Sequence, residues 1–500
     1  MTAMQTSAAL TEWQRLSPWA VVFLFVRGAV RFARENIPLL VGVGAGAAYV
    51  EAIGVTETLL GVGVLLLIGG LIALQYYQRF RFRLDGDVLL VQKGLIERIE
   101  IKVSADRVQH TAVDQPAYMR PFNVVRFSVD TPGGITTEVE LPGIPRPFAD
   151  ILRQVLGTGA AAGDAEAPAT ERLLYRVTPG GLTLHGLASN HAYVLAAVAA
   201  PIMQPLERLA RERLREPGNL EWLQPVLDRP LLTVAIGIPS LLLALILASV
   251  TFAWLRFYGF RLIQDQDRFI QYSGFLTQRE QTLNASKLQS VEWVQTAVGR
   301  LLGCGHLICR QYGGLPRGAE QAGSSFLIPG VRVAQAPSLR AVFWPGLTAI
   351  PPLQAVDRYY RRVMALRLGL AGAALLGLMA LLALEPLWLW GLVPLPIVAW
   401  VLGHLRWRAV GWQQQGRYLA VRRGLLGSRT SYFPLENVQT ASVRQSWFQR
   451  RRGLATLELA LASGPETIPF IPLATARRLA NEGLYRVERL AAPPADRLSP

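Results

Sequence analysis

The chain has 500 residues, 51% of them hydrophobic, and a mean hydropathy of +0.27, which is too apolar for an ordinary soluble protein of this size. The net charge of +16 comes from 51 Lys and Arg spread along the chain, a distribution that argues against nucleic-acid binding and for charge that flanks membrane spans. Two cysteines and five scattered histidines provide no disulfide framework and no metal-ligand cluster, so we expect neither a metal nor a cofactor.

The N-terminal segment, residues 1–36, does not have the pattern of a secretory signal. Its apolar run is interrupted by Arg27, Arg31 and Arg34. We therefore predict a helix from Pro18 to Arg34 that lies in a membrane interface.

Six stretches are long and apolar enough to suggest membrane-spanning helices. They occur at 37–53, 58–75, 190–205, 231–254, 366–384 and 387–403. Short connections predict antiparallel hairpins at 37–75 and 366–403, and a longer, charged external loop joins the middle pair at 187–254. With six crossings, 46 of the 51 Lys and Arg fall on one side, which the positive-inside rule identifies as cytoplasmic. The sequence thus predicts a multi-pass protein of the bacterial cytoplasmic (inner) membrane with both termini inside.

Three segments between and after these hairpins align without gaps, which indicates an internal repeat. Each begins with a glycine and two large apolar residues, has a Gln at +15 and an Arg at +26, and has a residue tolerant of positive φ at +29. The glycines are Gly94, Gly274 and Gly424; the glutamines are Gln109, Gln289 and Gln439; the arginines are Arg120, Arg300 and Arg450; the +29 residues are Asn123, Gly303 and Gly453.

Each repeat has the sequence pattern of antiparallel strands. Charged and apolar residues alternate from Arg98 to Val103, which predicts a strand with one buried face. Asp85-Gly86 predicts a hairpin turn, and each repeat closes with a helical stretch, at 146–156, 331–343 and 473–490. We expect three small β-barrels at 79–156, 256–345 and 405–490, each capped by a C-terminal helix, with a linker at 157–186.

The order of turn, Gly-Φ-Φ, Φ-Gln and Arg-x-x-Gly/Asn, where Φ is a large apolar residue, resembles the bacterial pleckstrin-homology-like (PH-like) membrane proteins of the YdbS/YdbT type over essentially the whole chain. The resemblance implies transmembrane hairpins paired with three PH-like domains. It also implies a membrane-bound scaffold or sensor that assembles with a shorter one-domain relative and acts in envelope stress or antimicrobial-peptide resistance.

The repeat residues suggest two kinds of role. We interpret the glycines and glutamines as structural, because a glycine fits a bend between hairpin strands. The repeat arginines fit either a salt bridge at the barrel rim or a contact with phosphates. The segment SWFQRRRG, which contains Trp447, Phe448, Arg450, Arg451 and Arg452, fits either an anionic lipid surface or a solvated loop.

We find no constellation of catalytic residues, so we expect binding rather than catalysis. Eukaryotic PH domains often hold phosphoinositides with basic residues in the first hairpin loop, but here that loop reads Asp85-Gly86-Asp87 in the first repeat and Asp265-Gln266-Asp267 in the second. This acidic tip favours a peptide or protein ligand. The competing hypothesis is a permease or flippase-like transporter, although the predicted spans show no polar pathway.

Overall fold

The computed structural model describes residues 12–35, 55–94, 97–108, 110–130, 139–158, 172–189, 230–311, 326–347, 351–383 and 391–491. The chain forms two compact units, Met1–Arg176 with Ser189–Asn284 and Val177–Ala188 with Ala285–Pro500. The boundary cuts the second repeat, so each unit holds one whole terminal repeat and half of the middle one.

The first unit contains a four-stranded antiparallel sheet in the order β1-β2-β3-β4 and a seven-stranded sheet in the order β7-β6-β5-β11-β10-β9-β8. Its strands are β1 (Gln14–Arg15), β2 (Arg81–Asp85), β3 (Val88–Lys93), β4 (Ile99–Ser104), β5 (His110–Pro116), β6 (Val124–Asp130), β7 (Val139–Pro145), β8 (Arg172–Arg176), β9 (Arg261–Asp265), β10 (Arg268–Ser273) and β11 (Thr277–Asn284). Its helices are α2 (Ala20–Glu35), α5 (Val55–Arg79), η1 (Ala105–Arg107), η2 (Ala117–Phe122), α6 (Arg146–Thr158) and α10 (Pro230–Phe257).

The core of the first repeat lies between β2–β4, β5–β7 and α6. Alternate residues of β2 point into it, so that Phe82 and Leu84 are buried while Arg81 and Arg83 are only partly covered, as the pleat of a strand requires. Leu152 of α6 is fully buried in the same core, and α6 closes it in the way predicted for a capping helix.

The second unit contains a seven-stranded sheet in the order β14-β13-β12-β18-β17-β16-β15 and a three-stranded sheet in the order β19-β20-β21. Its strands are β12 (Leu288–Gln295), β13 (Cys304–Gln311), β14 (Phe326–Arg332), β15 (Gln354–Ala355), β16 (Gly411–Gln415), β17 (Tyr418–Gly424), β18 (Ser428–Pro434), β19 (Val438–Arg444), β20 (Leu454–Leu461) and β21 (Gly464–Pro472). Its helices are α7 (Pro179–Ala188), η3 (Ala285–Lys287), α11 (Ala297–Leu301), α12 (Ala336–Phe343), η5 (Pro345–Leu347), α13 (Tyr359–Ala383), α14 (Leu395–Ala409), η7 (Leu435–Asn437), α15 (Trp447–Arg450) and α16 (Leu473–Ala491).

Neighbouring repeats share a sheet within each unit. In the first unit, β5 of repeat one pairs with β11 of repeat two, and in the second unit, β12 of repeat two pairs with β18 of repeat three. The expectation of separate barrels therefore needs correction, because the second sheet of one repeat continues into the first sheet of the next.

The prediction of six membrane spans in three hairpins is wrong for the part of the chain that the structure describes. There, two helices are long and apolar enough to cross a membrane, at Ala235–Phe257 and Tyr359–Leu382; they overlap the predicted spans at 231–254 and 366–384. The predicted span at 58–75 lies within helix α5, which is not one of these two helices. The predicted spans at 37–53 and 190–205 lie outside the described residues, and helix α14 covers only part of 387–403. The described fold also contains strands in four sheets.

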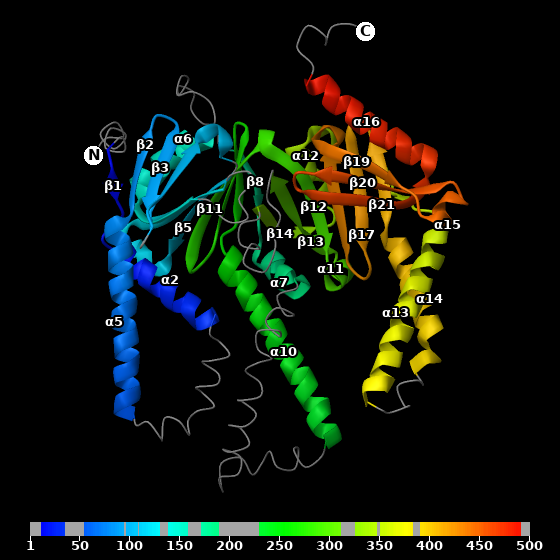
Figure 1. The fold of residues 1–500 in the computed structure, drawn as a ribbon, viewed down its shortest axis with the longest axis horizontal. Helices are drawn as coiled ribbons and strands as arrows, with labels where there is room; N and C mark the ends of the chain where they lie inside the picture. Colours follow the sequence, from blue (N-terminus) through cyan, green and yellow to red (C-terminus); the bar gives the residue numbers. More distant parts are fainter. Residues whose placement is uncertain are drawn as a thin grey trace. The chain divides into compact units, whose positions relative to one another are not determined.

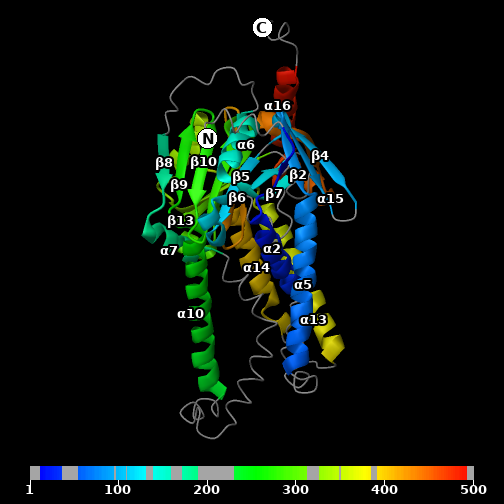
Figure 2. The same ribbon diagram turned by 90° about the vertical axis from the view of Figure 1, so that its left-hand side faces the viewer.

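Apolar helices lead directly into the first long strand of each repeat. Only residue 80 separates α5 from β2, and three residues separate α10 from β9. Both helices extend away from the strands that follow them (Figures 1 and 2). Among the terminal helices, α16 matches its predicted range, whereas α12 begins five residues late because Val331 and Arg332 complete β14.

Candidate functional site

The repeat glycines begin three segments that we call the Gly loops: Gly94–Glu97, of which residues 95 and 96 lie outside the described ones, Gly274–Thr277 and Gly424–Gly427. A Cβ atom added at the glycine would lie 1.8 Å from the Glu97 carbonyl oxygen in the first loop, 1.9 Å from that of Thr277 in the second and 2.1 Å from that of Gly427 in the third. Gly94 and Gly274 also have φ angles of 133° and 111°. A side chain is therefore excluded at all three positions by the backbone three residues ahead.

The second Gly loop is fixed to the end of an apolar helix. The Gly274 N–H donates to the Tyr258 carbonyl at 2.9 Å, and the Phe275 N–H donates to the Leu255 carbonyl at 2.9 Å. These bonds satisfy carbonyls that a helix end leaves open. The side chains of Phe275 and Leu276 are left more than half exposed where α10 ends.

The repeat arginines bind the Gly loop of the following repeat. Arg120 Nη2 donates to the Phe275 carbonyl at 2.6 Å, and Arg300 Nη1 donates to the Leu426 carbonyl at 3.1 Å. Both contacts thus join position +26 of one repeat to the apolar pair of the next. For Arg120 and Arg300 these contacts are with backbone carbonyls, which neither hypothesis from the sequence included.

Arg450, the third repeat arginine, lies in an exposed segment that we call the basic turn, Ser446–Gly453. Ser446 and Gln449 form a capping box that starts α15, so the turn is ordered by its own sequence. Trp447 and Phe448 are 58% and 54% exposed. The Arg450 side chain is also exposed and has no hydrogen-bond or ion-pair partner among the described residues.

The other two arginines of the basic turn stack on aromatic rings. The Arg451 guanidinium lies 3.7 Å from the ring centroid of Trp447, and that of Arg452 lies 4.0 Å from the ring centroid of Tyr359. Tyr359 is the first residue of α13. The basic turn therefore lies against the beginning of an apolar helix of membrane-spanning length.

A buried acid with two arginines ties the first repeat to the second. Asp114 on β5 is 4% exposed; its Oδ1 accepts from Arg279 Nε of β11 at 2.9 Å, and its Oδ2 pairs with Arg126 of β6. The two guanidinium groups hold the pKa of the Asp114 carboxyl below its ordinary value despite the opposing effect of burial. The carboxylate is therefore charged and matched in the folded unit.

The second unit repeats this arrangement with other residues. Glu292 on β12 is 1% exposed and pairs with Arg310 of β13 and with Arg429 of β18. Arg279 and Arg429 both stand at +5 of their repeats, whereas Asp114 is at +20 and Glu292 at +18. The alignment did not reveal these acids because they do not share an offset.

The repeat glutamines lie where strands begin irregularly. The pairing of β12 shifts register between Leu288 and Ser290, and that of β19 shifts between Val438 and Thr440, so Gln289 and Gln439 occupy equivalent β-bulges. Gln109 lies outside the described residues. The +29 residues Asn123, Gly303 and Gly453 have φ angles of 51°, 64° and 62°, which confirms the predicted need for positive φ.

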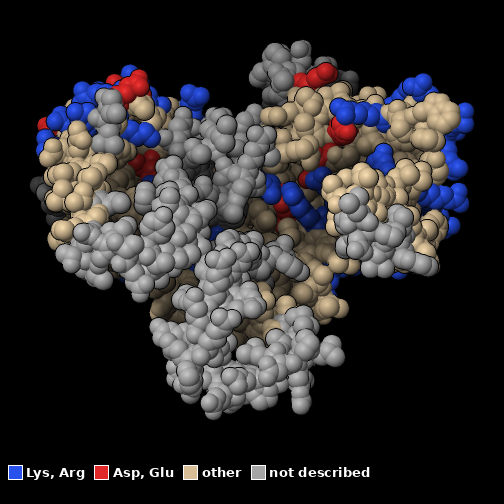
Figure 3. Space-filling model, turned by 60° about the horizontal axis from the view of Figure 1, so that its bottom comes forward, with Lys and Arg blue, Asp and Glu red and all other residues tan. Residues whose placement is uncertain are grey.

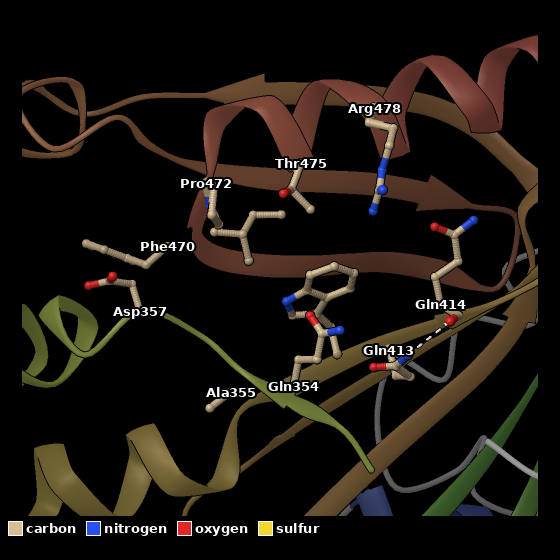
Figure 4. A pocket seen from close by; sticks show the side chains of 11 residues that line it. Gln354, Ala355, Asp357, Gln413, Gln414, Phe470, Pro472, Thr475 and Arg478 are labelled. Carbon is tan, nitrogen blue, oxygen red and sulfur yellow. Dashed lines mark hydrogen bonds between the residues drawn. The ribbon is translucent and has the colours of Figure 1, made fainter. Parts of the chain in front are cut away.

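A pocket of about 390 Å³ opens in the third repeat between β16, β21 and α16 (Figure 4). Its polar lining includes Gln413, Thr475 and Arg478. Asp357, also in the lining, accepts the Tyr359 N–H at 2.7 Å and so caps α13. Within the described ranges, no cluster of His, Cys, Asp and Glu has the geometry of a metal site. On the face of the molecule that Figure 3 shows, the described residues expose more Lys and Arg than Asp and Glu.

These repeats are similar to those of known proteins. The family model described as "Bacterial PH domain" matches residues 38–159, 221–343 and 363–487. The chain is similar to the UPF0699 transmembrane protein YdbT of Bacillus subtilis (strain 168), with 21% identity over 416 residues that cover 77% of this chain and 80% of that protein. No solved structure matches the chain. With three matches that cover most of its length, the chain belongs to the bacterial PH domain family.

Proposed function

We propose that the chain is a membrane-anchored, non-enzymatic scaffold that presents PH-like repeats for partner binding at an anionic lipid surface. The observation that carries this proposal is the exposure of its apolar helices. Of the most apolar window in Ala235–Phe257 and in Tyr359–Leu382, only 6% and 0% are buried. A soluble protein does not leave such long apolar surfaces in water, whereas a bilayer covers them.

The arginines of these helices support one orientation. In α10, Arg256 lies in the last turn, next to β9 of the second repeat. In α13, Arg361 and Arg362 lie in the first turn and Arg367 lies about two turns from the start; Arg406 and Arg408 lie in the last turn of α14, next to β16. Each apolar helix thus has its arginines at the end that adjoins a PH-like repeat, which favours the cytoplasmic side for the repeats. The name of the similar Bacillus subtilis protein, a transmembrane protein, supports a location in a membrane.

The basic turn supports contact with lipid. Exposed Trp447 and Phe448 are the residue types that favour the interface, and Arg452 holds the turn against Tyr359 at the arginine-rich end of α13. A Lys or Arg near an anionic surface contributes about 1 kcal/mol. Arg450 and Arg451 together would contribute about 2 kcal/mol to docking of this repeat, or roughly thirtyfold.

Spin-label accessibility in nanodiscs tests the proposal on the full chain. A nitroxide is attached at Phe448→Cys in a chain whose Cys304 and Cys309 are replaced by Ala. We expect a strong oxygen effect and a weak effect of the aqueous quencher in anionic nanodiscs, and a partial reversal with Arg450→Gln and Arg451→Gln. A label at the exposed Tyr485 of α16 serves as the water-exposed control. Release of the chain from membranes by alkaline carbonate would refute membrane anchoring itself.

The scaffold and the transporter differ in a second measurement. A scaffold produces no flux, so lipid scrambling and solute uptake in reconstituted vesicles should equal those of empty vesicles. Flux that depends on the protein would favour the transporter. A shorter one-domain partner and a role in envelope stress stay predictions from the family resemblance.

A further inference from the structure

In the described fold, strands β4 and β19 lie at the edge of a sheet, whereas the equivalent strands of the other repeats lie inside one. Strands β5 and β12 each lie between two neighbours, but the equivalent β19 pairs only with β20. Likewise β11 and β18 have neighbours on both sides, but the equivalent β4 pairs only with β3 among the described residues. The first repeat therefore has an open first sheet, and the third repeat has an open second sheet.

The side chains on the open edges are uncovered. At +17 to +19, the residues of β5 and β12 are all buried, whereas Ala441, Ser442 and Val443 of β19 are half-buried. At +6 to +8, the residues of β11 and β18 are buried, whereas Glu100 and Lys102 of β4 are exposed. The residues at these positions are therefore buried where a strand of the adjoining repeat pairs with theirs.

Both existing ladders between repeats use one register. Asp114 lies opposite Arg279 in the first unit, and Val294 lies opposite Arg429 in the second. In each case, position +20 of one repeat faces position +5 of the next. The same register would place Arg444 of a free β19 opposite Ile99 of a free β4, and Ser442 opposite Ile101.

We propose that β19 binds β4 of a second copy of this chain, so that copies join head to tail in the register of the internal ladders. Open strand edges pair readily with another chain, and β4 is the matching element that each copy itself provides. Such a heterologous contact closes into a ring or extends as a filament.

The side chains fit this pairing. In the first unit, Val113 lies opposite Glu280, and the proposed register places Val443 opposite Glu100, again a valine and a glutamate. Glu280 is neutralised by two arginines of the preceding repeat's helix α6, Arg153 and Arg146, the latter at 3.7 Å.

Helix α16 offers the corresponding charge. Arg146 and Arg153 are the first and eighth residues of α6, which lie on one helix face. In α16 the fifth residue, Arg477, falls on the same face and is exposed. Arg477 is thus the cation that Glu100 of the second copy would meet.

The free repeat arginine completes the match. Arg120 and Arg300 each donate to the carbonyls of the next Gly loop, whereas Arg450 meets no such loop among the described residues. In the head-to-tail pair, Arg450 would lie beside Gly94, with which the second copy's first repeat begins.

Disulfide trapping between differently tagged full-length chains tests the register. In a chain in which Ala replaces Cys304 and Cys309, one copy has Ser442→Cys and the other has Ile101→Cys. We expect a disulfide that links the two tags upon oxidation in detergent. The control pairs Val443→Cys with Ile101→Cys, which a shift of one residue directs to opposite faces. The proposal is overturned if the tags do not link.

Self-association of the detergent-solubilised chain, measured by sedimentation, gives a second test. Arg450→Ala should weaken it about tenfold or more, because a charge-assisted hydrogen bond is lost; the matched Arg451→Ala should not. Glu100→Arg and Arg477→Glu should each weaken association, and a mixture of the two variants should restore it. A sedimenting mass of one chain at all concentrations, or equal effects of Arg450→Ala and Arg451→Ala, would refute the proposal that β19 binds a second copy. A different PH-like chain would then be the partner to seek.

Discussion

Replacement of Asp114 by Asn should loosen the ladder that joins the first two repeats. The carboxylate is 4% exposed and is the shared partner of Arg126 and Arg279. An asparagine can accept from only one of the two guanidinium groups through its oxygen, and its amide N–H₂ then faces the second guanidinium group. Because breaking a buried ion pair from one side costs about 3–5 kcal/mol, we expect the free energy of opening of β5 and β11 to fall by about 3 kcal/mol.

Hydrogen exchange followed by mass spectrometry measures this opening locally. A loss of about 3 kcal/mol corresponds to exchange that is more than a hundredfold faster in peptides from β5 and β11. Peptides from β20 and β21 report on the third repeat and should not change. The matched control is Asp85→Asn, because the Asp85 side chain is 70% exposed and lies 3.7 Å from Arg83, and such surface pairs contribute little.

The pH dependence follows from the direction of the pKa shift. Asp114 has a pKa below its ordinary 3.8 in the folded unit, so its contribution to stability is complete above pH 3.8 and is lost as pH falls through the lowered pKa. After correction for intrinsic exchange rates, protection of β5 and β11 should be constant from pH 7 to 5 in the parent chain. Less than a threefold effect of Asp114→Asn at pH 7 would refute the reasoning.

Three further predictions concern single side chains. Glu292→Gln should raise exchange of β12 and β18 by a similar hundredfold, because Glu292 is equally buried between Arg310 and Arg429. Gly94→Ala and Gly424→Ala should each destabilise their repeat by about 2 kcal/mol or more, seen as faster proteolysis, because the added Cβ would lie within 2.1 Å of a carbonyl oxygen. Burial and the nearby Glu292 raise the pKa of Glu466 above its ordinary 4.5, so its stabilising contribution is lost as pH rises from 4.5 through the raised pKa; thermal unfolding of Glu466→Gln should lack this decline, and an unchanged pH profile would contradict it.

The elements that the sequence predicted correctly are those with a strong local pattern. The alternation from Arg98 to Val103 became β4, and the amphipathic stretch at 473–490 became α16, because period-two and helical patterns are written within one segment. The membrane spans were predicted from hydropathy alone. Of the six, only 231–254 and 366–384 form helices that meet the length and composition of a span in the described chain.

The sharing of sheets between repeats could not be read from the alignment. A gapless repeat shows that three segments fold alike, but pairing of β5 with β11 joins residues more than 160 positions apart. Nothing local in either strand distinguishes a neighbour in the same repeat from one in the next. The burial of polar residues in β11, such as Gln281 and Thr282, became apparent only in the structure.

The two ladders also explain why the alignment found the arginines at +26 and missed the acids. Arg120 and Arg300 bind backbone carbonyls, whose positions follow from the shared fold, so one residue type serves at one offset. Asp114 and Glu292 bind side chains, and an arginine is long enough to meet an acid at either +20 or +18 of the facing strand. An arginine that binds the backbone therefore stands at the same offset in each repeat, whereas the acid of a side-chain ion pair can stand at different offsets. Arg450 stands at the same offset as Arg120 and Arg300, but among the described residues its side chain has no carbonyl to bind. We therefore assign Arg450 to the proposed contact between the open strand β19 and a second copy.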